Sequence, residues 1–336
     1  GAYSSEVVSS RAPQMSTRSW ASGDQATTPT GGGRGGGRGG GFSSRLEQSN
    51  GNPLEELKTQ DLEPCSSPES QVSRVLACMG KANTSGPKEL DWQAQYEGLV
   101  LARRLAVHHG DVLAPRLHDL ILAVLPAVDA LRSQTSRISL MLIKELFMYI
   151  GRGMDSELDF VVPILIKKSS EGNFLSAESD LVIGEMLNHS TEAKAVLALL
   201  SCANHKAALA RTKVAAHIDA ALHGAGGRLF QGPGGREVME RAFTTMVAFL
   251  DEGSMDTRTL AKRVLWEMSR LLGPSGEFER MQRRLPSEIK AKQVRAVVEN
   301  PKGPPAAPTI AGKFSSSRQS SRGRVASSGS GLRAGG

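Results

Sequence analysis

The residues that could carry out chemistry in this chain are few, and their spacing does not suit catalysis. His108 and His109 are adjacent, and neighbours on a helix point about 100° apart, so the two rings do not share a face that could hold a metal ion. His205 and His217 lie too far apart in the sequence to form a helical pair. The glycine-rich stretch 232–236 lacks the Lys-Ser or Lys-Thr pair of a phosphate-binding loop. We therefore expect a protein that is not an enzyme and that uses no cofactor.

The cysteines and the carboxylates also indicate ordinary structural roles. An odd number of cysteines without framework spacing argues against a disulfide scaffold and predicts a reducing compartment, and no zinc-ligand spacing occurs. We interpret Glu171, Glu178 and Asp180 as surface carboxylates, and we find no nucleophile paired with a base. The three cysteines are Cys65, Cys78 and Cys202.

The net charge of +7 is concentrated at the C-terminal end. Eight basic and eight acidic residues precede Lys88, and 27 basic and 26 acidic residues follow as far as Glu299. Residues 300–336 hold six basic and no acidic residues, so this tail attracts any polyanion. The near-neutral middle lacks the concentrated basic face that nucleic-acid binding needs. We therefore expect nucleic acid not to be the main partner.

Both ends of the chain have the composition of disordered segments. Residues 1–87 are rich in Gly, Ser and Arg, and the run 31–41 is similar to the arginine–glycine segments of RNA-binding proteins, although it also fits a flexible linker. One short helix is expected over 71–79, where four apolar residues share a face. Residues 300–336 form a basic Ser/Arg-rich tail behind prolines that stop a helix. Because no apolar run reaches the roughly 20 residues of a transmembrane helix, we expect no membrane partner.

The middle of the chain, residues 88–299, predicts an all-α solenoid. Apolar residues recur at helical spacing, the helices are about 12 to 20 residues long, and nothing between them resembles a pair of strands. Taken two at a time, the helices repeat about every 40 residues, which is the period of HEAT and armadillo repeats, and about five pairs fit. The expected helices cover 99–110, 112–128, 133–150, 158–168, 175–187, 191–202, 207–222, 237–250, 257–272 and 277–299.

The turn that opens each expected pair is the natural binding surface, because such turns line up along one edge of a solenoid. Trp92 opens the first pair, and Ser133 is placed to cap the helix that opens the second. The fourth and fifth turns carry the basic residues Lys206, Arg211 and Arg258. An aromatic residue followed along the edge by basic residues is a common composition for a protein interface.

This ordered set of turns resembles the TOG domains of microtubule regulators, as found in CLASP proteins and in the TOG-array regulators of axonemal microtubules (Crescerin). The resemblance spans about Glu89 to Leu272, close to the length of one TOG domain. The best-matching stretches are Asp91-Trp92, Leu131-Arg132-Ser133-Gln134 and Ala210-Arg211-Thr212-Lys213-Val214-Ala215.

The resemblance implies a tubulin-binding function. In TOG domains this edge binds the αβ-tubulin heterodimer, so the family pattern implies that Trp92 packs on one tubulin subunit and that Thr135 sits in the second contact turn. Lys206, Arg211 and Arg258 would meet acidic tubulin surface, which favours encounter and register. The implied partner is αβ-tubulin or the microtubule, with no small-molecule substrate. The implied location is the cytoplasm and cytoskeleton, and the axonemal relatives point to the cilium.

The third turn departs from the family pattern, and two other functions stay open. Asn173, Phe174 and Leu175 stand where the family commonly places a basic residue, and no Lys or Arg follows until Lys194. This departure predicts weaker tubulin binding. The alternatives are a HEAT-repeat scaffold for another protein, since repeat folds do not specify the partner, and RNA binding through the Gly/Arg run and the basic tail.

Overall fold

The computed structural model describes residues 57–84 and 92–308, and every regular element in these two ranges is a helix. The predicted all-α fold class is therefore confirmed. All described residues belong to one unit, Glu56–Gly336. None of the described helices is long and apolar enough to cross a bilayer.

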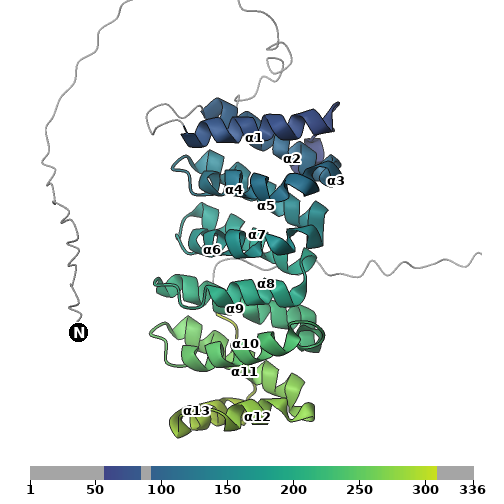
Figure 1. Cartoon of the computed structure of the whole chain (residues 1–336). Helices are drawn as coiled ribbons and strands as arrows, with labels where there is room; N and C mark the ends of the chain where they lie inside the picture. The colour runs from purple at the N-terminus through teal and green to yellow at the C-terminus, as the bar shows by residue number, and fades with distance from the viewer. Residues whose placement is uncertain (1–56, 85–91, 309–336) are drawn as a thin grey trace, which may run out of the picture. The chain divides into compact units, whose positions relative to one another are not determined.

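The helices of the described ranges form six pairs that stack one on the next (Figure 1). In the five pairs whose connection is described, a short turn joins the first helix to the second. Second helices of successive pairs pack side by side, as α5 does on α7 and α9 on α11. The pairs are α1 (Pro68–Thr84) with α2 (Trp92–His108), α4 (Leu117–Val128) with α5 (Ser133–Ile150), α6 (Leu158–Ser169) with α7 (Phe174–His189), α8 (Glu192–Ser201) with α9 (Ala208–Ala225), α10 (Gly235–Phe249) with α11 (Met255–Leu272), and α12 (Glu277–Arg283) with α13 (Glu288–Val298).

Short elements join one pair to the next. The short helix α3 (Gly110–Leu113) is followed by a 3-10 turn, η2 (Ala114–Arg116), so the helix expected over 112–128 is divided in two. Gly151 and Gly226 follow α5 and α9 with φ of 59° and 58°, a region that favours glycine, and their N–H groups close the last helical turn. The remaining 3-10 helices are η1 (Thr59–Asp61), η3 (Gly151–Ser156), η4 (Gly226–Phe230) and η5 (Gly273–Ser275).

The helical array begins earlier than residue 88, where the sequence placed its start. Helix α1 is longer than the short helix expected over 71–79, and its Val75 and Met79 are buried in the common core, 1% and 0% exposed. The sequence pattern also paired each helix with the wrong neighbour, because α1 was left out of the count. The turns expected to open the pairs therefore lie within them. Residues 1–56 lie outside the described part of the chain.

At the C-terminal end, residues 300–308 pack on the array instead of leaving it at once. The carbonyl oxygen of Pro305 accepts a hydrogen bond of 3.0 Å from Nη1 of Arg263 in α11. The expected helix over 277–299 is interrupted at 284–287, between α12 and α13. The rest of the basic tail, 309–336, lies outside the described residues.

Asp180 is not the surface carboxylate that the sequence suggested. It is 3% exposed and lies in a buried cluster between α7 and α9, where His217, Lys213 and Ser169 donate to its carboxylate. Burial opposes its ionisation, but the hydrogen bonds from His217, Lys213 and Ser169 outweigh burial and hold the pKa of Asp180 below its usual value. Burial lowers the pKa of the His217 ring, against the opposing effect of Asp180. The cluster ties the third pair to the fourth.

Candidate functional site

The described turns that join the two helices of a pair lie along one edge of the array, on the left in Figure 1. We call this edge the turn edge. Its described turns are the short connections 129–132, 170–173, 202–207, 250–254 and 284–287, and the first turn, 85–91, lies outside the described residues.

An apolar row runs along the turn edge. Each described turn, or the first two residues of the helix after it, presents one large apolar side chain to solvent. The members of the row are Leu131 (106% exposed), Phe174 (59%), Leu209 (43%), Met255 (73%) and Ile289 (71%). Four of them are the most exposed large apolar side chains among the described residues, so the concentration on one edge is not a scatter of single surface residues.

Trp92 begins α2 and is half-buried. The guanidinium carbon of Arg132, from the next turn, lies 5.2 Å from the centre of the Trp92 ring. At that distance a cation and an indole ring attract each other, so the start of α2 and the second turn are held together at the surface. Trp92 extends the apolar row toward the N-terminal end.

Thr135 lies beneath the edge and not on it. Its exposed fraction is 7%, and its carbonyl oxygen accepts a hydrogen bond of 2.8 Å from Oγ of Ser139. Ser133 does not cap α5, although the sequence suggested that it would. Helix α5 begins at Ser133, and Arg132 occupies the capping position without a side-chain cap bond. The exposed surface of the second turn comes instead from Leu131 and Arg132.

The basic residues of the fourth and fifth turns divide into one exposed cation and two arginines that hold the backbone. Lys206 is exposed and makes no ion pair with any described residue. Arg211 forms a two-bond pair with Glu252, at 2.7 and 2.8 Å, and this pair joins the fourth turn to the fifth. Its Nη1 also donates to the carbonyl oxygens of His205 and Lys206, at 2.7 and 3.1 Å. These contacts fix the backbone that presents Lys206.

Arg258 acts on its own turn in the same way. Its Nη1 donates to the carbonyl oxygens of Glu252 and Gly253, at 2.5 and 2.9 Å. The N-terminal end of α11 is further fixed by Ser254, whose Oγ accepts from the N–H of Thr257 at 3.3 Å. The fifth turn is therefore rigid at its base, while Met255 beside it is exposed.

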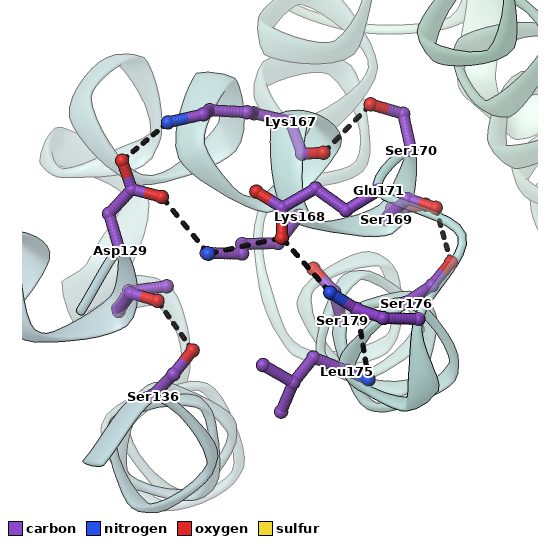
Figure 2. A network of polar contacts seen from close by, with 12 residues as sticks. Asp129, Ser136, Lys167, Lys168, Ser169, Ser170, Glu171, Leu175, Ser176 and Ser179 are labelled. Atoms are coloured by element: carbon purple, nitrogen blue, oxygen red, sulfur yellow. Dashed lines mark hydrogen bonds and ion pairs between the residues drawn. The ribbon is translucent and has the colours of Figure 1, made fainter. Parts of the chain in front are cut away.

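The third turn has basic neighbours that the sequence pattern missed (Figure 2). Lys167 and Lys168 lie in the last turn of α6, just before the third turn, whereas the expectation considered only residues that follow it. Both lysines bind Asp129 of the second turn, with Lys168 Nζ at 3.0 Å from Oδ1. Lys168 also lies 3.1 Å from Glu171. The charges of the two lysines and of Asp129 and Glu171 cancel, so the third turn is not net basic.

Asp129 and Lys168 are fixed as a charged pair. Burial opposes the ionisation of Asp129, but hydrogen bonds from Lys167 and Lys168 outweigh it and lower the pKa of that carboxyl. Burial likewise disfavours the charge on Lys168, yet its bonds to Asp129 and Glu171 raise its pKa above the usual value. Asn173 completes the turn, since its Oδ1 accepts from the N–H of Leu175 at 3.0 Å. Figure 2 shows these contacts bridging the second and third turns.

The turn edge thus combines one exposed large apolar side chain at each described turn with polar and charged side chains, several of which fix the turns by hydrogen bonds. Within the described residues, no group of three or more His, Cys, Asp or Glu side chains is arranged to hold a metal ion. The arrangement suits binding of another macromolecule through shape and apolar contact, with Lys206 and Arg132 supplying positive charge.

Known proteins resemble this chain in both sequence and fold. TOG array regulator of axonemal microtubules protein 1 of Homo sapiens is 31% identical over 178 residues, which are 53% of this chain and 10% of the human protein. The protein of the same name from Mus musculus is 28% identical over 229 residues, which are 68% of this chain and 12% of the mouse protein. This chain therefore spans about a tenth of the length of these relatives.

A solved structure and a family model agree with these relatives. A structure described by the statement that Crescerin uses a TOG domain array to regulate microtubules in the primary cilium has a TM-score of 0.50 at 14% identity, covering 73% of this chain and 92% of that one. At that identity the likeness concerns the fold alone. A model of the CLASP N-terminal family matches residues 88–287, more than half of the chain. The chain is a TOG-type helical-repeat protein that belongs to the CLASP N-terminal family.

Proposed function

We propose that this chain binds αβ-tubulin or the microtubule lattice through its turn edge, as a non-catalytic regulator of microtubules. The observation that carries the proposal is the apolar row, because apolar side chains concentrated on one rigid edge are the composition of a binding surface. Membership of the CLASP N-terminal family supports tubulin as the partner. Relatives named for axonemal microtubules favour the cytoskeleton, and the cilium within it, as the location.

The residues expected from the sequence take different parts in this proposal. Trp92 and the adjoining Arg132 form the anchor at one end, and Lys206 is the cation that meets acidic tubulin surface. Arg211 and Arg258 act mainly by holding the fourth and fifth turns in position. Thr135 supports the second turn from beneath. The apolar row supplies contact area that does not depend on charge.

The experiment compares two double variants of the full chain. Leu131→Ser with Phe174→Ser removes two members of the apolar row. Leu122→Ser with Phe160→Ser is the matched control, because these side chains are also exposed, at 46% and 44%, but lie on α4 and α6 away from the turn edge. Binding is measured as co-elution with tubulin and as microtubule co-sedimentation.

We expect the first double variant to lose roughly tenfold or more in affinity, since burying one exposed leucine in an interface stabilises a complex by about 1.5–3 kcal/mol. The control should bind like the parent chain. Equal binding by both variants would remove the turn edge from the proposal. A parent chain that binds neither tubulin nor microtubules would overturn the function and leave a scaffold for another protein as the better account.

A further inference from the structure

The segment just before α1, residues 57–66, lies against α2, and we call it the strap. Side chains of α2 hold it through its main chain. Arg103 Nη1 donates to the carbonyl oxygen of Leu57 at 2.9 Å. Arg104 donates to the carbonyl oxygens of Glu63 and Pro64, at 2.6 and 3.0 Å. Each of these bonds comes from a charged donor to a backbone acceptor, which is the stronger class of hydrogen bond.

The two adjacent histidines also bind the strap. Nε2 of His108 lies 2.7 Å from the carbonyl oxygen of Leu62, and because a carbonyl only accepts, this nitrogen carries the proton. His109, just beyond the end of α2, has the opposite role, since its Nε2 accepts from the N–H of Cys65 at 3.1 Å. The neighbouring rings thus satisfy one acceptor and one donor of the strap's main chain.

Only a few side chains of the strap are used. Leu62 and Cys65 are buried, at 5% and 9% exposed. Oγ1 of Thr59 donates to Oε1 of Glu145 at 2.7 Å. Beneath the strap, Glu145 forms a buried two-bond pair with Arg103. Lys58, Gln60, Asp61 and Glu63 are not buried.

We propose that this surface of α2 is a binding site for a peptide with a 3-10 turn followed by an extended stretch, which the chain occupies with its own strap. Main-chain contacts give affinity without regard to sequence, and pockets for a few side chains set the preference, as in other modes of extended-peptide recognition. The ligand is a peptide with a hydroxyl at the place of Thr59 in a 3-10 turn, followed by an extended stretch with an aliphatic residue at Leu62 and a small apolar residue at Cys65. This site is separate from the turn edge and does not depend on tubulin binding.

Occupation by the strap makes the site closed to outside peptides in the parent chain. A tethered segment acts at an effective concentration of order millimolar for a short flexible linker, so a free peptide competes only after the strap is released. A change that weakens the strap should therefore do two things. It should open the site to a free peptide, and it should expose Cys65.

The first measurement follows Cys65 by the rate of thiol alkylation in the full chain. Burial raises the pKa of the Cys65 thiol, against the lowering effect of Arg104, so the docked thiol reacts slowly. Arg104→Ala should speed alkylation of Cys65 roughly tenfold, as expected when hydrogen bonds from a charged group are lost. Buried Cys202 in the same chain reports that the fold is intact. Arg74→Ala, on exposed α1 surface, is the matched control and should leave the rate unchanged.

The second measurement is fluorescence anisotropy of a labelled synthetic peptide with the sequence of residues 57–66. The full chain with Leu62→Asp should bind it, because a carboxylate at this buried position releases the strap, whereas the parent chain should not. Adding Arg104→Ala to the released chain should weaken peptide binding roughly tenfold. A released chain that keeps Cys202 protected and still fails to bind the peptide would overturn the proposal. Equal alkylation of Cys65 in the parent and Arg104→Ala chains would do the same, even if Leu62→Asp prevents folding.

Discussion

At the turn edge, arginine side chains shape the backbone as much as they present charge. Arg211 and Arg258 both donate to carbonyl oxygens of the turns beside them, and Arg211 also pairs with Glu252 of the next turn. A guanidinium has five N–H donors in a fixed plane, so it can join several acceptors that lysine would not reach together. Lys206, by contrast, makes no such contact and remains exposed.

Replacing these two kinds of basic residue should therefore separate stability from binding. Arg211→Ala leaves a half-buried Glu252 without its partner and frees two carbonyl groups, so we expect a loss of about 1–3 kcal/mol in unfolding free energy. For a domain of this size that corresponds to a fall of several degrees in melting temperature. Lys206→Ala should leave the melting temperature unchanged and weaken tubulin binding at low salt. The reverse assignment, a stable Arg211→Ala and an unstable Lys206→Ala, would contradict this division.

The buried histidine His217 should make stability depend on pH. Its pKa is lowered by burial, so below its ordinary value of 6.5 the unfolded chain takes up a proton that the folded chain does not. The stabilising contribution is therefore complete above that value and is lost as pH falls through the lowered pKa. Asp180 and Lys213 are charged groups near the ring: Oδ1 of Asp180 accepts from His217 and from Ser169, and its Oδ2 accepts from Lys213.

His217→Gln keeps a hydrogen bond to Asp180 but removes the titration. As the pH falls from about 7 to about 5, we expect the melting temperature of the parent chain to decrease more than that of this variant. The measurement is a thermal melt followed by circular dichroism at each pH. Parallel pH profiles for the two proteins would show that His217 does not contribute in this range.

At the scale of helices, the pattern of apolar residues predicted the elements better than it predicted their partners. Most helices after residue 110 begin and end within a few residues of their expected places, because the apolar spacing is strong and the turns are short and polar. The pairing was wrong because α1 lies in a polar, Gly- and Ser-rich region whose composition hid it. One helix left out at the start shifts every later pair by one.

Individual site residues were harder to predict than the edge that carries them. Basic and aromatic residue types pointed to residues at or near the turn edge, but spacing alone does not say that Thr135 faces the core or that Arg211 is paired within the chain. The apolar row was missed because an exposed leucine such as Leu131 looks like a core residue until the helix that follows is placed. Lys167 and Lys168 were missed because they precede their turn.

Helix α1 should be required for the stability of the array, although it lies outside the stretch that the family model matches. Met79 is fully buried against the core and packs near Gly98 of α2. Met79→Ala should lower the free energy of unfolding by about 2–5 kcal/mol through the lost apolar burial and the cavity left behind. Urea unfolding measures the change, and Ala77→Ser on the exposed side of α1 is the control. A Met79→Ala chain as stable as the parent would show that α1 does not contribute to the stability of the array.

At the scale of the whole molecule, two kinds of attraction act on different parts of the chain. The apolar row lies on the rigid turn edge and acts over contact distances. The positive charge lies mostly in the tail, since residues 309–336 hold five of the basic residues and no acidic ones, so their removal takes the net charge from +7 to +2. Electrostatic attraction to an acidic surface is screened by salt, whereas apolar burial is not.

Salt should therefore separate the contributions of the tail and of the apolar row to microtubule binding. Deleting residues 309–336 should leave the melting temperature nearly unchanged, because their Ser-, Gly- and Arg-rich sequence offers no apolar face to bury. Co-sedimentation with microtubules should weaken at low salt, and the difference from the parent chain should shrink as the ionic strength rises and the Debye length falls from about 30 Å at 0.01 M toward about 8 Å at 0.15 M. The double variant Leu131→Ser with Phe174→Ser should lose affinity by a similar factor at every salt concentration. If the tail deletion instead weakens binding equally at low and high salt, its contribution is not electrostatic, and a specific contact made by the tail would have to replace the charge argument.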